Sequence, residues 1–161
     1  MAAQLVLDAL RDLGIPYERI DHPPVATVAE AEAHWGGVDA AHCKNLFLRN
    51  QKGDRHYLVI VSASKRVDLR HVANQIGDGK LSFASPERLM KYLGVTPGSV
   101  SPFGLIHDPA RHVQVFLDSD LARSNRITFH PNDNTATLVL SFADFQRFLA
   151  HVGHRVREIA V

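Results

Sequence analysis

The sequence predicts a single α+β domain over residues 1–161, with a curved, mixed, barrel-like sheet and helices around it. A chain of 161 residues with 45% hydrophobic content is long enough to bury one substantial core. Helix-type and strand-type patterns interleave irregularly, and several strands come in adjacent pairs, which disfavours a doubly wound parallel sheet. No internal repeat, low-complexity tract or linker divides the chain.

Local signals define the elements of the first part of the chain. An apolar stripe of helical period runs to Leu13, and Gly14 ends it. Thr27 and Glu30 have the spacing of a capping box, and the polar, glycine-containing segment 50–54 suits a hairpin turn. The predicted elements are a helix over 2–13, a strand over 17–21, a helix from 27 that ends at 36–37, and strands over 44–49 and 56–63.

The second part of the chain has similar signals. Asp68, Ser85 and Ser141 are typical residues for helix N-caps, while Gly77 and Gly94 are suited to end the first two of these helices. The predicted elements are helices over 68–75, 85–93 and 142–151, and strands over 81–83, 113–117, 126–129, 135–140 and 154–161.

The net charge of +1 conceals an uneven distribution. Residues 1–43 hold two basic and seven acidic side chains (−5), residues 44–91 hold ten and four (+6), and residues 92–161 hold six of each. The middle part, which includes Lys65, Arg66 and Arg70, is therefore a candidate surface for the phosphate backbone of a nucleic acid. A solvated surface without a partner explains the same charges.

Cysteine and histidine usage disfavours metal and disulfide chemistry. Cys43 is the only cysteine, which excludes an intramolecular disulfide and a multi-cysteine zinc site. The histidines form no ligand pattern, so we expect neither a metal nor a cofactor. We also find no signal peptide and no apolar run long enough to cross a bilayer, and therefore expect a cytoplasmic protein with no membrane partner.

Three short stretches outline a polar site built on the sheet. Lys44 shares a strand face with Leu46 and Leu48, so it either reaches water at the strand end or lines a pocket. The uncharged segment 94–104 contains three glycines and two prolines; it is either a turn or a set of backbone N–H groups that converge on one oxygen. His130 ends a strand before Pro131, as a structural hydrogen-bonding group or as part of a site.

Taken together, Lys44–Leu48, the segment 94–104 and Phe129–Asn132 resemble the YbaK/ProX family of aminoacyl-tRNA editing domains, the fold that is inserted into bacterial prolyl-tRNA synthetases. The resemblance covers essentially the whole chain, and is greatest to the free-standing prolyl-tRNA editing proteins of the PrdX and ProXp-ala type. It implies a trans-editing deacylase that hydrolyses mischarged tRNA(Pro), with Ala-tRNA(Pro) as the expected substrate.

The resemblance also implies roles for individual residues. Lys44 matches the family's required lysine, Gly98 and Pro102 match its G-x-x-x-P loop, and His130 matches its strand-end histidine. We therefore expect catalytic roles for Lys44, Gly98 and His130. The expected substrate-binding residues are Asn45, Ser99, Pro102, Phe129 and Asn132. The expected partner is the acceptor end of aminoacyl-tRNA(Pro), with Lys65, Arg66 and Arg70 as the expected tRNA contacts. Whether prolyl-tRNA synthetase is a second partner is left open.

Other functions remain open from the sequence. A deacylase of Cys-tRNA(Pro), as in the YbaK branch, would have the same fold and the same Lys44. A non-catalytic module that binds tRNA or a synthetase would need the basic middle part but not Lys44 together with the uncharged segment. A thiol or metal hydrolase would depend on Cys43 or on clustered histidines.

Overall fold

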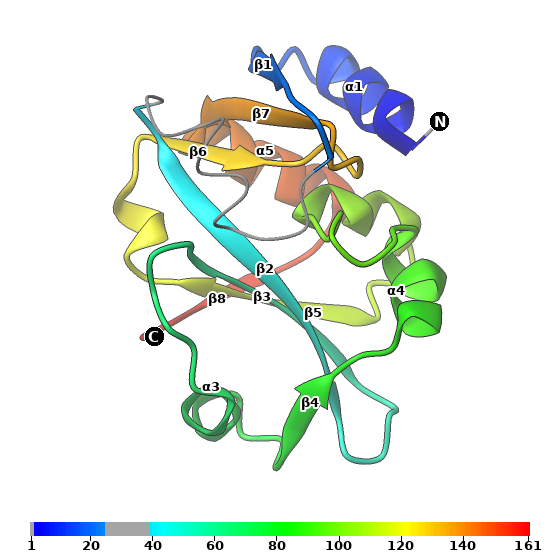
Figure 1. Ribbon diagram of the computed structural model, residues 1–161, viewed down its shortest axis with the longest axis vertical. Helices are drawn as coiled ribbons and strands as arrows, with labels where there is room; N and C mark the ends of the chain where they lie inside the picture. Colours follow the sequence, from blue (N-terminus) through cyan, green and yellow to red (C-terminus); the bar gives the residue numbers. More distant parts are fainter. Residues whose placement is uncertain (1, 25–38) are drawn as a thin grey trace.

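A mixed sheet dominates the computed structural model, which describes residues 2–24 and 39–161 (Figure 1). Within these residues the sheet has eight strands in the order β1-β7-β6-β2-β3-β5-β8, with β4 paired to β2. The strands are β1 (Glu18–Asp21), β2 (Ala41–Asn50), β3 (His56–Ser62), β4 (Leu81–Phe83), β5 (Val113–Asp118), β6 (Arg126–Phe129), β7 (Ala136–Ser141) and β8 (Val156–Ile159). The predicted α+β class with a mixed sheet is confirmed.

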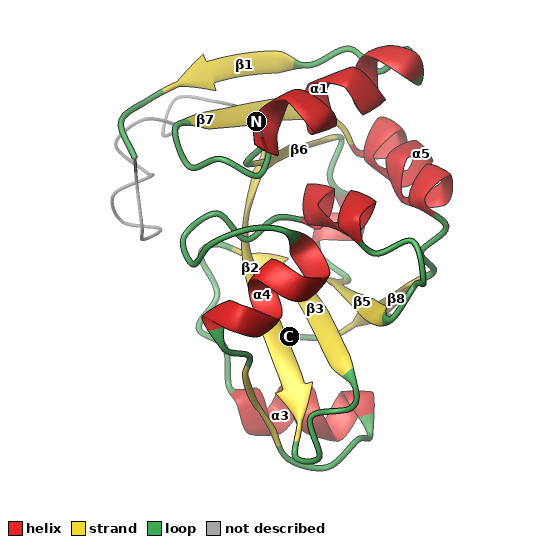
Figure 2. Cartoon of the chain, turned by 90° about the vertical axis from the view of Figure 1, so that its right-hand side faces the viewer, coloured by secondary structure: helices red, strands yellow, loops and turns green. Residues whose placement is uncertain are grey.

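The helices lie at both ends of this sheet, apart from α4 (Pro86–Leu93), which Figure 2 shows in front of β2 and β3. The others are α1 (Ala2–Asp12), α3 (Leu69–Ile76) and α5 (Phe142–Val152), with short 3-10 helices η1 (Pro102–His107) and η2 (Leu121–Arg123). Figure 2 shows α1 and α5 near β1, β6 and β7, whereas α3 lies at the opposite end beside β2 and β3. The helix predicted from residue 27 lies outside the described residues.

Strand β2 joins the two halves of the sheet. Its first residues pair in parallel with β6, at Ala41↔Ile127 and His42↔Thr128. The rest of β2 forms the predicted hairpin with β3. The side chain of Asn50 shapes the hairpin turn, because its Oδ1 accepts hydrogen bonds from the N–H groups of Gly53, Asp54 and Arg55. A ten-residue strand with partners at both ends thus connects β6 to β3 in one bent sheet.

Two hydrophobic clusters lie on the two faces of the sheet. One contains Cys43 and Phe47 of β2 together with residues of α1, α4, α5 and η1. The other lies under α3 and contains Leu48 of β2 with Val72 and Phe116. Successive β2 side chains therefore alternate between the two clusters, as the strand geometry requires.

Local signals placed most helix ends correctly. Asp68, Ser85 and Ser141 each accept a hydrogen bond from a backbone N–H of the first helical turn, and Gly77 and Gly94 adopt the left-handed conformation at the C-caps. No helix among the described residues is long and apolar enough to span a membrane.

Two sequence predictions need correction. The predicted strand 154–161 is shorter, since β8 spans only Val156–Ile159 and the side chain of His154 instead bonds to the buried Asp108. The segment 94–104 is not all loop, because Ser101 caps η1 and Pro102 begins it. Proline suits the first helical position, where its missing N–H has no partner to lose.

Candidate functional site

The parallel pairing of β2 with β6 places Lys44 and His130 on the same face of the sheet. Nδ1 of His42 lies 3.1 Å from Oγ1 of Thr128, so these paired residues point to one side. Lys44 follows His42 by two residues within β2, which returns its side chain to that side. His130 comes directly after the last residue of β6, and its ring contacts His22, which bonds to Thr137 on the same side. The intervening Phe129 points to the opposite side, into the first cluster.

This polar face extends over β7 and the segment after β1. Nε2 of His22 lies 2.9 Å from Oγ1 of Thr137, and the His22 ring meets the His130 ring edge-on at 5.9 Å between centroids. Sequence reasoning missed His22, His42, Thr128 and Thr137. The sequence could have indicated Thr128, because it lies two residues before His130. The residues that β2, β7 and the segment at His22 add to the polar face could not be found in this way, because they depend on pairing across the sheet.

His130 is held as a neutral imidazole. Its Nδ1 donates a hydrogen bond of 2.9 Å to the carbonyl of Ala136, which leaves a lone pair on Nε2. Burial lowers the pKa of His130, and nearby His22 lowers it further, although the Ala136 carbonyl partly opposes this effect. The ring is thus suited to accept a hydrogen bond near neutral pH.

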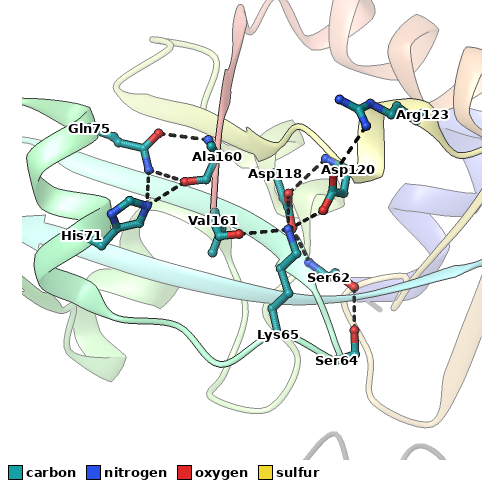
Figure 3. Close-up of polar contacts among 10 residues, drawn as sticks. All are labelled: Ser62, Ser64, Lys65, His71, Gln75, Asp118, Asp120, Arg123, Ala160 and Val161. Atoms are coloured by element: carbon teal, nitrogen blue, oxygen red, sulfur yellow. Dashed lines mark hydrogen bonds and ion pairs between the residues drawn. The ribbon is translucent and has the colours of Figure 1, made fainter.

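Lys44 is half-buried on β2, and its ammonium donates a hydrogen bond to the main-chain carbonyl of Lys65. Lys65 is in turn fixed by its own ammonium, as Figure 3 shows. Its Nζ lies 2.9 Å from Asp118, 2.7 Å from Asp120 and 3.0 Å from the carbonyl oxygen of Val161. The segment after β3 that contacts Lys44 is therefore tied to β5 and to the residues after β8.

The three residues predicted to contact tRNA differ in their surroundings. The ammonium group of Lys65 forms ion pairs with Asp118 and Asp120, whereas the side chains of Arg66 and Arg70 are exposed. In residues 2–24 and 39–161, neither arginine forms an ion pair. Contact of Arg66 and Arg70 with tRNA remains a prediction that this geometry favours, and Lys65 is better placed to hold the chain near Lys44.

The segment 94–104 contributes Val95 and Phe103 to the first hydrophobic cluster. Gly98 has a φ of 91°, which favours glycine, and Ser99 donates its N–H to the carbonyl of Thr96. The ring of Phe103 packs edge-on against Phe129, with 5.9 Å between centroids, which links this segment to the end of β6. Among the described residues, no hydrogen bond joins Gly98, Ser99 or Pro102 to Lys44 or His130.

Two buried amides have polar atoms without partners. Oδ1 of Asn45, and both Oδ1 and Nδ2 of Asn132, are buried and form no hydrogen bond with the described residues. Asn132 also has a φ of 62°, in the left-handed region. Such atoms are rare in folded proteins and are often found where a ligand or water binds. The predicted substrate-binding role of Asn132 fits this observation, while Asn45 points to the face opposite Lys44.

Phe129 and Cys43 face the core. The centroids of the Phe129 and Phe145 rings lie 4.6 Å apart. This position favours a role for Phe129 in fixing the backbone next to His130 over direct contact with a substrate. Burial, with a further contribution from Asp118, raises the pKa of the Cys43 thiol well above its usual range, which keeps it protonated and weakly nucleophilic. In the described part of the chain, no three His, Cys, Asp or Glu residues are grouped for metal binding.

Comparisons with known proteins identify the relatives of this chain. Residues 22–148 match the family described as the aminoacyl-tRNA editing domain. The prolyl-tRNA editing protein ProX of Acetoanaerobium sticklandii is 41% identical, over 98% of this chain and 96% of that protein. Prolyl-tRNA synthetase associated domain-containing protein 1 of Bos taurus is 36% identical, over 90% and 86%. A crystal structure described as a candidate trans-editing enzyme for prolyl tRNA synthetase has a TM-score of 0.71 at 25% identity, over 99% and 97%.

Proposed function

Since this chain belongs to the family of aminoacyl-tRNA editing domains, we propose that it is a trans-editing deacylase that removes alanine from mischarged tRNA(Pro). Family membership supports the coarser part, a hydrolase of aminoacyl-tRNA esters that acts on tRNA(Pro). The observation that carries the proposal is the common polar face of Lys44 and His130, which the β2–β6 register creates.

The reaction needs positioning more than a protein nucleophile, because the aminoacyl ester is already activated. In our proposal the Lys44 ammonium holds the terminal nucleotide through its phosphate or ribose, since a cation would repel the substrate's α-ammonium group. Neutral His130 and Asn132 orient the acyl end, and N–H groups near Gly98 polarise the ester carbonyl. Water attacks the carbonyl carbon with help from the free ribose hydroxyl. The ester C–O bond then breaks, and a proton passes to the ribose oxygen.

Selectivity for alanine would be steric. A synthetase that accepts proline cannot strongly reject the smaller alanine, because missing methylene groups change binding by only about 1–3 kcal/mol. A second, smaller hydrolytic pocket can exclude proline by size. This double sieve would remove Ala-tRNA(Pro) and spare Pro-tRNA(Pro). Prolyl-tRNA synthetase is a natural partner to test, because it produces both species.

A panel of tRNA(Pro) charged with Ala, Cys, Ser or Pro tests the proposal. We expect rapid release of alanine and slow release of proline, measured as the decay of labelled aminoacyl-tRNA at equal concentration. A preference for cysteine would move the chain to the YbaK-type activity, and rapid hydrolysis of Pro-tRNA(Pro) would contradict the sieve. Binding without any deacylation would support a non-catalytic module instead.

A further inference from the structure

The six arginines after residue 91 fall into two sets. Three form ion pairs with carboxylates. The pairs and their nitrogen–oxygen distances are Arg123 with Asp120 (4.0 Å), Arg126 with Glu18 (3.1 Å) and Arg147 with Asp144 (2.9 Å). The other three, Arg111, Arg155 and Arg157, are exposed and form no ion pair within the described ranges 2–24 and 39–161. These three unpaired arginines all line one cleft of about 490 Å³.

The cleft lies where β5 and the edge strand β8 begin, and Figure 2 shows these strands side by side. We call it the arginine cleft. The buried carboxylate of Asp108 connects the start of β5 to the residues before β8, both of which line the cleft. It accepts hydrogen bonds from the N–H groups of His112 and Val113, and it lies 2.9 Å from Nε2 of His154. The backbone that carries the arginines is therefore held in place by a buried polar contact.

Arg111 is placed in the cleft by unusual backbone geometry. Its φ of 57° lies in the left-handed region, which costs free energy for a residue with a side chain. Its guanidinium lies against Gly153, where a β-carbon would be 2.6 Å from Arg111 Nε. Gly153 thus leaves the space that this guanidinium fills, next to Arg155.

We propose that the arginine cleft binds backbone phosphates of the tRNA substrate, outside the catalytic face; this rests on the proposed function. A guanidinium presents a planar fork of donors that matches phosphate oxygens, and several cations without carboxylate partners favour a polyanion. The sequence did not indicate this surface, because residues 92–161 have no net charge. In the folded chain, three arginines of this part form ion pairs, and the other three come together in the arginine cleft.

The sheet geometry puts the cleft within reach of the same substrate molecule. Leu46, Val59, Phe116 and Arg157 are paired in one row across β2, β3, β5 and β8, so Arg157 lies on the sheet face of Lys44. Three strand spacings separate the ends of this row, about 14 Å. An acceptor stem is longer than this, so one tRNA could contact Lys44 with its terminal nucleotide and the cleft with its backbone.

Binding of uncharged tRNA(Pro) at several salt concentrations tests the proposal. We expect the double variant Arg155→Gln/Arg157→Gln to bind about tenfold more weakly at low salt, equivalent to about 1.4 kcal/mol. The slope of log affinity against log salt should also fall by about one per lost phosphate contact. The variant Arg155→Lys/Arg157→Lys should keep most of the slope. Arg11→Gln/Arg123→Gln, which removes two exposed and paired arginines, is the control of equal charge.

The outcomes separate this proposal from the proposed function. If the Arg155→Gln/Arg157→Gln variant keeps the affinity and the salt slope of the wild type, the cleft is not a phosphate site. If the Arg11→Gln/Arg123→Gln control loses as much tRNA affinity as this variant, the loss is a general effect of charge, and the proposal is equally overturned. Because the assay uses uncharged tRNA, it reports on the cleft even if the wild type deacylates none of the charged tRNAs. Thermal unfolding of each variant verifies that the fold is retained.

Discussion

Nζ of Lys65 lies 2.9 Å from Oδ1 of Asp118, a carboxylate with no exposed surface. Hydrogen bonding to Asp120, and then to Asp118, raises the pKa of Lys65 despite its partial burial. Asp118 also accepts hydrogen bonds from the N–H groups of Ser62 and Asp120. Since the carbonyl of the same Lys65 accepts a hydrogen bond from Lys44, Asp118 is connected to the proposed site through one residue.

We expect Asp118→Asn to impair both stability and deacylation. Breaking a buried ion pair costs about 3–5 kcal/mol when the remaining charge has no other partner. We expect a smaller loss of roughly 2–3 kcal/mol here, because Lys65 retains Asp120 and some contact with water. The unfolding free energy in urea measures this loss. If the connection to Lys44 matters, kcat at a temperature where the variant is folded should fall more than tenfold. The control Asp120→Asn removes the exposed partner and should retain most activity.

Replacement of Lys44 should separate activity from folding. We expect Lys44→Ala to lose more than about 100-fold in kcat/KM, the magnitude found when one electrostatic contact to a transition state is removed. Its circular dichroism should stay close to wild type, and its affinity for tRNA(Pro) should fall far less than kcat/KM, because Lys44 would supply only one of many contacts with the tRNA. Lys44→Arg should also be impaired, because a planar fork does not reproduce a compact ammonium. Lys52→Ala, at an exposed position of the hairpin turn, is the control. Near-normal turnover of Lys44→Ala would refute its role.

His130 should matter less, and mainly at low pH. Its lowered pKa keeps the ring neutral at pH 7, so protonation should reduce wild-type deacylation only below its ordinary pKa of about 6.5. We expect His130→Ala to be roughly tenfold slower at pH 7 and to lose this acid-dependent decline. The measurement is kcat/KM from pH 5 to 8, with exposed His151→Ala as the control. Complete inactivity of a folded His130→Ala would indicate a general base instead.

Local elements could be predicted from the sequence because their causes are local. The caps at Asp68 and Ser85 and the hairpin around Asn50 each depend on side chains within five residues. The membership of the polar face could not be predicted, because His22 meets Thr137 across 115 residues and His42 meets Thr128 across 86. These contacts depend on strand order and register, which no local pattern specifies.

The sequence also did not indicate which charged side chains pair after folding. Lys65 was predicted as a tRNA contact from the basic middle part of the chain, yet its partners Asp118 and Asp120 come from the neutral last part. Conversely, Arg155 and Arg157 gave no signal in a balanced segment and proved to be unpaired within the described chain. Charge counts over a segment do not indicate which side chains will meet after folding.

Gly98→Ala tests whether the backbone of segment 94–104 has a catalytic role. An alanine at a φ of 91° should lower the unfolding free energy by about 1–2 kcal/mol. Gly79→Ala is a matched control, because Gly79 also has a positive φ and a β-carbon there would have no neighbour within 4 Å. Both variants should lose stability, but only Gly98→Ala should lose deacylation activity, by more than about tenfold. Equal activities would argue against an oxyanion-binding role for this segment.

Because His56 is buried, we expect the free energy of unfolding to fall in mild acid. Arg88 can only donate, so His56 Nε2 accepts from Arg88 Nη1 at 2.9 Å, and Nδ1 donates to His112 Nε2 at 2.8 Å. Burial, together with the charges of His112 and Arg88, lowers the pKa of His56 from 6.5 to about 4. Between pH 6.5 and 4 the unfolded chain therefore binds a proton that the folded chain does not.

It follows that the contribution of His56 to stability is complete above pH 6.5 and is lost as the pH falls toward 4, at roughly 1 kcal/mol per pH unit. Urea unfolding at pH 7.5, 6 and 5 measures this dependence. His56→Gln should be less stable at pH 7.5, because it loses ring contacts with Phe47 and Tyr92, but its stability should depend less on pH. His151→Gln should retain the full wild-type dependence. Parallel pH profiles for His56→Gln and the wild type would show that another group titrates.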